Sequence, residues 1–153
     1  MKKSLFILLL AACGLHLQAQ DQLIQVARGY LQNGNYEKAA ATFKQLVEYN
    51  PKDVELQADY ARSLLGLKDY KNAEKAVKQW LKKDPDRVEA NFQLFRVYKG
   101  SEENRKAEKL FSRLLDHVPD LEEVIRSTSV MFEKENYFTE ATAIYEKGRT
   151  YHK

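Results

Sequence analysis

LIQVARGYLQNGNYEKAAATFKQLVEYNP, residues 23–51, is the stretch that decides the fold of this chain of 153 residues. Up to Leu31, its apolar residues recur every three or four positions, which is the period of an amphipathic helix. Asn33-Gly34-Asn35 interrupts this pattern, and Gly34 suits a left-handed turn residue. A second helical pattern follows and ends before Pro51, because proline lacks an amide donor and forces its predecessor out of helical geometry. The stretch therefore predicts two helices joined by a tight turn.

The same pattern returns along the chain at a period of 34 residues. All three prolines keep this spacing, and so do four alanines and two sets of large residues. These aligned sets are Pro51, Pro85 and Pro119; Ala39, Ala73, Ala107 and Ala141; Tyr30, Leu64, Tyr98 and Phe132; and Phe43, Val77, Phe111 and Tyr145. A repeat of this length indicates stacked supersecondary units, here helical hairpins. We expect further helices over residues 54–66, 70–83, 88–100, 104–117, 122–134 and 138–150.

The aligned alanines are expected at the point where the second helix of each hairpin crosses close to the first. A bulky residue there should force the helices apart, at a cost of about 1–3 kcal/mol. The large residues should fill the space between neighbouring hairpins, and Trp80 is expected in this core. Ile144 and Tyr145, on the last predicted helix, have no evident cover in the sequence.

The repeat resembles the tetratricopeptide repeat family. The first unit matches the family pattern at Ala27, Tyr30, Gly34, Tyr36, Ala39, Phe43 and Pro51. The expected units are residues 20–53, 54–87, 88–121 and 122–153, with departures at Gln57, Phe95 and Asn104. The resemblance implies an all-α fold, a right-handed α-solenoid of about four helical hairpins. It also implies a concave groove that holds extended or helical segments of partner proteins.

Residues 1–19 have the form of a bacterial secretory signal. A short positive segment, Met1-Lys2-Lys3, precedes an apolar one that is too short to span a bilayer, which takes roughly 20 residues. Cleavage after Ala19 would leave a mature chain beginning near Gln20. Alternatively, residues 10–13 resemble the lipobox of bacterial lipoproteins, with a signal over 1–12 and lipid on Cys13. We expect export to the periplasm, with an outer-membrane lipoprotein or a secreted protein as alternatives; the segment's ending resembles exported proteins of the Bacteroidetes group.

Charge and composition argue against several functions. Without Lys2 and Lys3, 23 basic residues face 22 acidic ones, so the chain lacks the broad basic field that nucleic-acid binding usually needs. Cys13 is the one cysteine, and the three histidines show no metal-ligand spacing on one helix face. No nucleophile elbow or phosphate-binding glycine loop is evident. The sequence predicts neither an enzyme nor a metal or cofactor site.

The family pattern, applied to this sequence, places an arginine on the concave side in three successive units. These residues are Arg28, Arg62 and Arg96, with Arg126 and the apolar Phe92 nearby. Guanidinium groups suit carboxylates and backbone carbonyls, so one hypothesis is that the five residues bind a partner peptide. The alternative is that each arginine pairs with a neighbouring carboxylate such as Glu55, Asp59 or Glu89. The family's clamp for chaperone tails is not expected here, because its lysine and asparagine positions hold Ile24, Arg28 and Asp59.

The sequence favours a non-catalytic scaffold or adaptor of the bacterial cell envelope that binds another protein in the groove. An alternative is a regulatory or chaperone-like module at the N-terminus of a longer exported enzyme or secretion-machinery protein. Self-association through an uncapped C-terminal repeat is a further expectation, because terminal repeats need a polar outer face.

Overall fold

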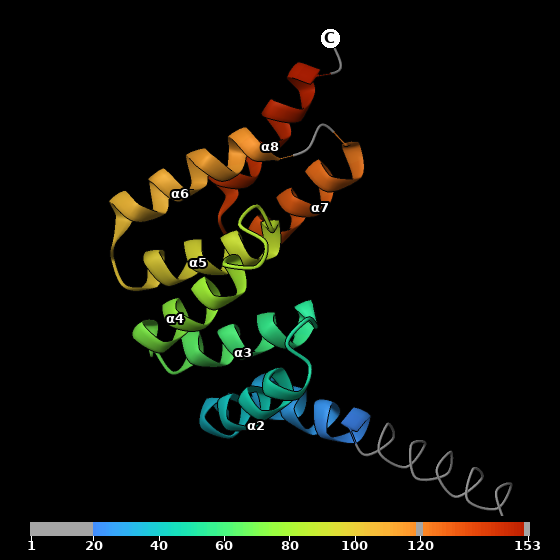
Figure 1. Cartoon of the computed structure of the whole chain (residues 1–153). Helices are drawn as coiled ribbons and strands as arrows, with labels where there is room; N and C mark the ends of the chain where they lie inside the picture. The colour runs from blue at the N-terminus through green and yellow to red at the C-terminus, as the bar shows by residue number, and fades with distance from the viewer. Residues whose placement is uncertain (1–19, 119–120, 152–153) are drawn as a thin grey trace, which may run out of the picture. The chain divides into compact units, whose positions relative to one another are not determined.

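The computed structural model describes residues 20–118 and 121–151, and every regular element among them is an α-helix (Figure 1). A helix over residues 20–32 comes first. It is followed by α2 (Tyr36–Tyr49), α3 (Val54–Gly66), α4 (Tyr70–Leu81), α5 (Val88–Gly100), α6 (Asn104–His117), α7 (Glu122–Glu133) and α8 (Phe138–Tyr151). The predicted helices are confirmed to within two residues at each end. The all-α class and the four hairpins are confirmed with them. Residues 1–19, with both readings of the export signal and Cys13, lie outside the described residues.

The chain divides into two compact units, and the boundary falls between Leu67 and Lys68. The first unit contains the helix over 20–32 with α2 and α3, and the second contains α4 to α8. The boundary therefore lies in the turn of the second predicted hairpin.

The turns inside the four hairpins share one backbone feature. Gly34 has a φ of 72°, which confirms the left-handed turn predicted for it. The residues 34, 68 and 102 positions further on also have positive φ, although they are Lys68, Glu102 and Asn136. In three of the turns a backbone amide donates a hydrogen bond to a carbonyl five residues earlier, in the preceding helix. The bond from Asn35 N to Tyr30 O, at 2.9 Å, is one example. The turn geometry is thus repeated even where the glycine is not.

The first unit is built on a small apolar core. Ala27, Ala39, Phe43, Leu46 and Leu56 form it, and each is buried. The helix over 20–32 (blue) lies alongside α2, because the small side chains of Ala27 and Ala39 let the two backbones approach (Figure 1).

α2 also packs on α3, and the contact depends on a glycine. The ring of Tyr36, at the start of α2, lies over Gly66 at the end of α3. A Cβ added to Gly66 would stand 2.5 Å from Tyr36 Cε1 and 2.6 Å from Cγ. The two helices therefore run antiparallel, and no side chain fits between the ring and the end of α3.

The second unit repeats this contact and adds an aromatic core. A Cβ added to Gly100, at the end of α5, would stand 2.5 Å from Cε1 of Tyr70 on α4. α5, α6 and α7 bury a cluster of rings with neighbouring centroids 4.7–6.5 Å apart. Its members are Phe92, Phe95, Phe111, Phe132 and Tyr137. Such edge-to-face pairs add about 0.5–1.5 kcal/mol each to the burial of their surface.

Core expectations from the sequence are largely met. The four aligned alanines are fully buried, and so is Trp80 to within a few per cent, as predicted. Ile144, for which no cover was expected, is also fully buried, so that prediction is wrong. It lies one turn along α8 from the buried Ala141, and α8 packs on both α7 and α6. Tyr145, the next residue, is 37 % exposed.

Candidate functional site

Two of the predicted groove arginines meet on one buried carboxylate of the first unit. Asp59, on α3, is 1 % exposed, and its Oδ2 accepts a hydrogen bond of 2.9 Å from Arg28 Nε. Its other oxygen, Oδ1, accepts from Nη2 of Arg62, one helical turn further along α3. Arg28 also donates from Nη2 to Glu55 Oε2 at 2.6 Å. We call Arg28, Glu55, Asp59 and Arg62 the Asp59 cluster.

The two carboxylates of the Asp59 cluster differ in how firmly they hold the arginines. Hydrogen bonds to Asp59 first, and to Glu55 second, raise the pKa of Arg28 above its usual value. The Asp59 bonds are shielded from water, whereas Glu55 is 77 % exposed, and an exposed pair of this kind contributes less than about 1 kcal/mol. Asp59 is thus the fixed partner of both arginines, and Glu55 is the replaceable one.

The guanidinium groups of the Asp59 cluster keep free donors. Arg28 uses Nε and Nη2, and Arg62 uses Nη2. A guanidinium carries five N–H donors, and neither group makes another hydrogen bond within residues 20–118 and 121–151. Both side chains are partly exposed, Arg28 by a third and Arg62 by nearly half. The cluster therefore presents aimed, solvent-accessible donors.

Arg96 belongs to the second unit and has different partners. Its Nη2 donates to Glu135 Oε2 at 2.9 Å, and its Nη1 donates to Gln93 Oε1 at 3.1 Å. Its guanidinium carbon lies 5.8 Å from the ring centroid of Phe92. Glu89, one of the carboxylates that the sequence offered as a partner, lies 4.0 Å from Arg87. Glu135 was missed because it lies in the turn before α8, at a position to which the family pattern assigns no groove role.

Phe92 and Arg126 complete the predicted set. Phe92 is 2 % exposed, with its ring centroid 4.7 Å from that of Phe132 and 6.5 Å from that of Tyr137. Its surface is used in packing against α7 and the turn after it, in the next hairpin, so its placement gives no support to a role as a partner's apolar anchor. Arg126 is exposed on α7. Of the predicted site residues, the structure thus brings Arg28 together with Arg62 in the first unit, and Arg96 together with Phe92 in the second.

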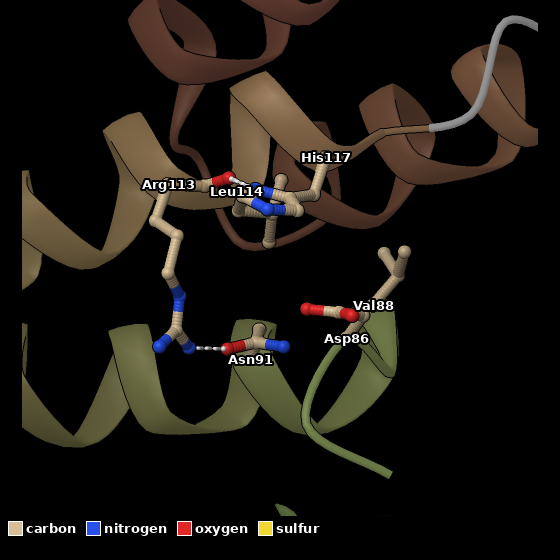
Figure 2. Close-up of a pocket in the computed structure, with 6 residues that line it drawn as sticks. All are labelled: Asp86, Val88, Asn91, Arg113, Leu114 and His117. Atoms are coloured by element: carbon tan, nitrogen blue, oxygen red, sulfur yellow. Dashed lines mark hydrogen bonds between the residues drawn. The ribbon is translucent and has the colours of Figure 1, made fainter.

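A shallow depression in the second unit offers a second set of polar groups. Asn91 is nearly buried there; its amide nitrogen donates to the carbonyls of Pro85 and Arg87, both at 2.9 Å, and its oxygen accepts from Arg113 Nη2 at 2.7 Å. The space has room for about one water molecule. The bonds tie the loop before α5 to α6, which is a structural role. The lining residues are Asp86, Val88, Asn91, Arg113, Leu114 and His117 (Figure 2).

Among residues 20–118 and 121–151, no group of three or more His, Cys, Asp or Glu side chains is placed to hold a metal ion. No helix in that part of the chain combines the length and the apolar character needed to cross a membrane.

Solved structures with a similar fold come from bacteria, plants and humans. The second TPR domain of human RPAP3, solved in complex with the HSP70 peptide SGPTIEEVD, has a TM-score of 0.58 and 20% identity, over 85% of this chain and 97% of that one. MamA from Desulfovibrio magneticus RS-1 has a TM-score of 0.55 and 19% identity, over 86% and 74% of the two chains. The TPR domain of Arabidopsis OM64 has a TM-score of 0.56 and 14% identity, over 76% and 96%. These likenesses show the fold alone.

Sequence comparison gives the family. No curated protein sequence significantly matches the chain. The profile of the tetratricopeptide repeat, however, matches residues 30–87 and again residues 64–126, which together make up more than half of the chain. The matched stretches include the Tyr36–Gly66 and Tyr70–Gly100 contacts between successive helices. The chain belongs to the tetratricopeptide repeat family.

Proposed function

We propose that this protein is a non-catalytic interaction scaffold that holds an acidic segment of a partner protein at the Asp59 cluster. One observation carries the proposal: a buried carboxylate orients two partly exposed arginines that keep free donors. Arginine forks bind carboxylates with two parallel hydrogen bonds, which gives both strength and orientation. A carboxylate of the partner takes the place of Glu55 on Arg28, while Asp59 keeps the guanidinium groups aligned.

A partner's carboxylate can displace Glu55 from Arg28 at low cost because Glu55 is exposed. Its pair with Arg28 is screened by water and contributes little, so a partner that brings several carboxylates at once competes well. The RPAP3 domain of similar fold was solved with a peptide that ends in Glu-Glu-Val-Asp, which supports an acidic ligand for this class of fold. The residues that bind it here are different ones, since the positions of the family's chaperone clamp hold Ile24, Arg28 and Asp59.

We place the scaffold in the bacterial cell envelope. The support is residues 1–19, whose basic start and short apolar core have the form of an export signal. The mature protein is then periplasmic and begins near Gln20, or is attached to the outer membrane through lipid on Cys13. Intact-mass measurement of the protein purified from its native host distinguishes the two forms, because lipidation adds several hundred daltons.

The test is affinity capture from the envelope fraction of the native host. Wild-type bait is compared with Arg28→Lys/Arg62→Lys, which removes both guanidinium forks but keeps positive charge beside the buried Asp59. Arg105→Lys, on an exposed arginine of α6, is the matched control. We expect one protein to be enriched by wild type and by the control but lost with the double variant, at unchanged helix content. Equal enrichment by all three baits would refute the proposal.

A further inference from the structure

The exposed face of α4, with the residues that flank this helix, carries lysines and no acidic side chain. Over residues 68–83, every exposed side chain is a lysine or a neutral amide. These exposed residues are Lys68, Lys71, Asn72, Lys75, Lys78, Gln79, Lys82 and Lys83. We call the six lysines among them the α4 lysine face.

The packing of α4 fixes the direction of this face. The buried residues of α4 are Ala73, Val77 and Trp80. At about 100° per residue, four of the lysines fall within about 60° of one another, on the side of the helix opposite the buried residues. These four are Lys71, Lys75, Lys78 and Lys82. Since each residue of a helix rises about 1.5 Å, they form a line of positive charge about 16 Å long that is directed at solvent.

The two acidic residues of this segment are engaged elsewhere or neutralise only one lysine. Asp69 caps the start of α4, where its carboxylate accepts from the backbone amide of Asn72 at 3.2 Å and from its side-chain amide at 2.7 Å. Glu74 Oε1 lies 2.7 Å from Lys78 Nζ and accepts from the Tyr98 hydroxyl at 3.1 Å. Within residues 20–118 and 121–151, the other five lysines of the face make no ion pair. Six lysines against two acids leave residues 68–83 with a net charge of +4.

The stability of the fold does not account for the α4 lysine face. Like charges three or four residues apart destabilise a helix, and the line contains three such neighbouring pairs. The helix dipole favours Lys78 and Lys82 near the end of α4, but it disfavours Lys71 in the first turn. The other second helices of the hairpins have mixed residues at the four positions of the line. They are Glu37, Ala41, Lys44 and Glu48 in α2; Arg105, Lys109, Ser112 and Asp116 in α6; and Thr139, Ala143, Glu146 and Thr150 in α8.

The residue types of the face indicate what it can bind. Protein interfaces are rich in Trp, Tyr and Arg and poor in Lys, and single-stranded nucleic acids are bound with aromatic rings that stack on the bases. Over residues 68–83, no arginine, aromatic or aliphatic side chain is exposed. The ring of Tyr70 lies on Gly100, and Trp80 is 7 % exposed. Lysine is a strongly hydrated point charge, which suits an anionic surface whose charges are mobile and have no fixed geometry.

From this charge complementarity we propose that the α4 lysine face binds the anionic headgroups of a membrane surface. α4 lies along the surface, the ammonium groups reach the lipid phosphates, and no side chain enters the hydrocarbon. Each lysine near such a surface strengthens binding by about fivefold. α4 belongs to the second unit and the Asp59 cluster to the first, so the lipid contact and the proposed protein contact use different residues.

The test is binding of the full-length protein to vesicles, followed by energy transfer from Trp80 to dansyl-labelled lipid. Trp80 is the one tryptophan of the chain and lies on α4, so the signal reports the approach of this helix. Vesicles of equimolar phosphatidylcholine and phosphatidylglycerol are compared with vesicles of phosphatidylcholine alone. Lys71→Gln/Lys75→Gln should weaken binding to the anionic vesicles about thirtyfold, and salt should weaken it in the wild type. The same variant should unfold in urea no more easily than the wild type, because both lysines are exposed.

The matched control is Arg105→Gln/Lys109→Gln, at the corresponding positions of α6. It removes the same charge from a face that also exposes Glu108 and Asp116, and it should weaken binding less than about threefold.

Four results would overturn the proposal. Equal weakening by both double variants would show that only net charge matters. Unchanged binding of Lys71→Gln/Lys75→Gln would place the contact elsewhere in the chain. Equal binding to both kinds of vesicle would show that anionic lipid is not recognised. Binding of soluble poly-L-glutamate, without binding of vesicles, would make an acidic protein segment the occupant.

Discussion

Replacing Gly66 by alanine measures how strongly the contact between Tyr36 and α3 depends on the absence of a side chain. The new Cβ would stand 2.5 Å from Tyr36 Cε1 and 2.6 Å from Cγ, closer than carbon atoms approach, so the ring must move by about 1 Å. Overpacking of this kind costs about 1–3 kcal/mol. Alanine in a helix recovers about 1 kcal/mol relative to glycine, which leaves a net loss of about 0–2 kcal/mol.

The assay is urea unfolding followed by far-ultraviolet circular dichroism, in a double-mutant cycle with Tyr36→Ala. Once the ring is gone, Gly66→Ala should stabilise the protein, so the two changes couple by about 1–3 kcal/mol. Gly29→Ala is the control, because a Cβ there meets nothing within 4 Å and should only gain helix propensity. Equal losses from Gly66→Ala with and without Tyr36 would refute the reasoning.

Three other predictions follow from the turns, the Asp59 cluster and one ion pair. Lys68→Gly and Glu102→Gly should each stabilise the chain by about 0.5–1 kcal/mol in urea unfolding, because both residues hold a positive φ that strains a side chain; Gly34→Ala should do the reverse. Glu55→Gln should tighten binding of an acidic peptide by up to about fivefold in titration calorimetry, since the peptide no longer displaces a carboxylate; weaker binding would contradict the role given to Glu55. The hydrogen bond from Lys78 lowers the pKa of Glu74 below 4.5, so its stabilisation should be complete above about pH 5 and be lost as the pH falls through the lowered value. The difference in unfolding free energy between wild type and Glu74→Gln, less than about 1 kcal/mol at this exposed pair, should shrink to zero in that range.

The helices could be predicted closely because the repeat shows every boundary several times. α4 is the one helix that ends clearly early, at Leu81 rather than residue 83. There the amide of Lys83 bonds to Trp80 O, three residues back, and tightens the last turn before Pro85. Ile144 was misjudged because α8 packs on both α7 and α6, two helices that precede it, so its burial needs no following repeat.

The candidate site was less predictable, because side-chain partners depend on packing between helices. The pairing of Arg28 and Arg62 with Asp59 was among the alternatives, since an acidic residue on an apolar helix face needs a counter-ion. That both arginines share this carboxylate depends on how the helix over 20–32 lies against α3. The burial of Phe92 depends on rings that arrive from α7 and its following turn, about 40 positions later in the sequence. Periodicity alone places such residues on a helix but does not say which neighbour covers them.

The contacts of Tyr36 with Gly66 and of Tyr70 with Gly100 make the order of the units matter. Excision of residues 54–87 would join α2 to α5 and set Tyr36 over Gly100, a matched pair. Excision of residues 88–121 would instead set Tyr70 over Lys134, a mismatched one. Units of equal length are therefore not equivalent, and we expect in-frame loss of a unit to cost more stability at a joint that creates a mismatched pair. Two positions per unit, one at the start of the second helix and one at the end of the next, therefore affect the stability of a shortened or lengthened array by about 1–3 kcal/mol for each mismatched pair.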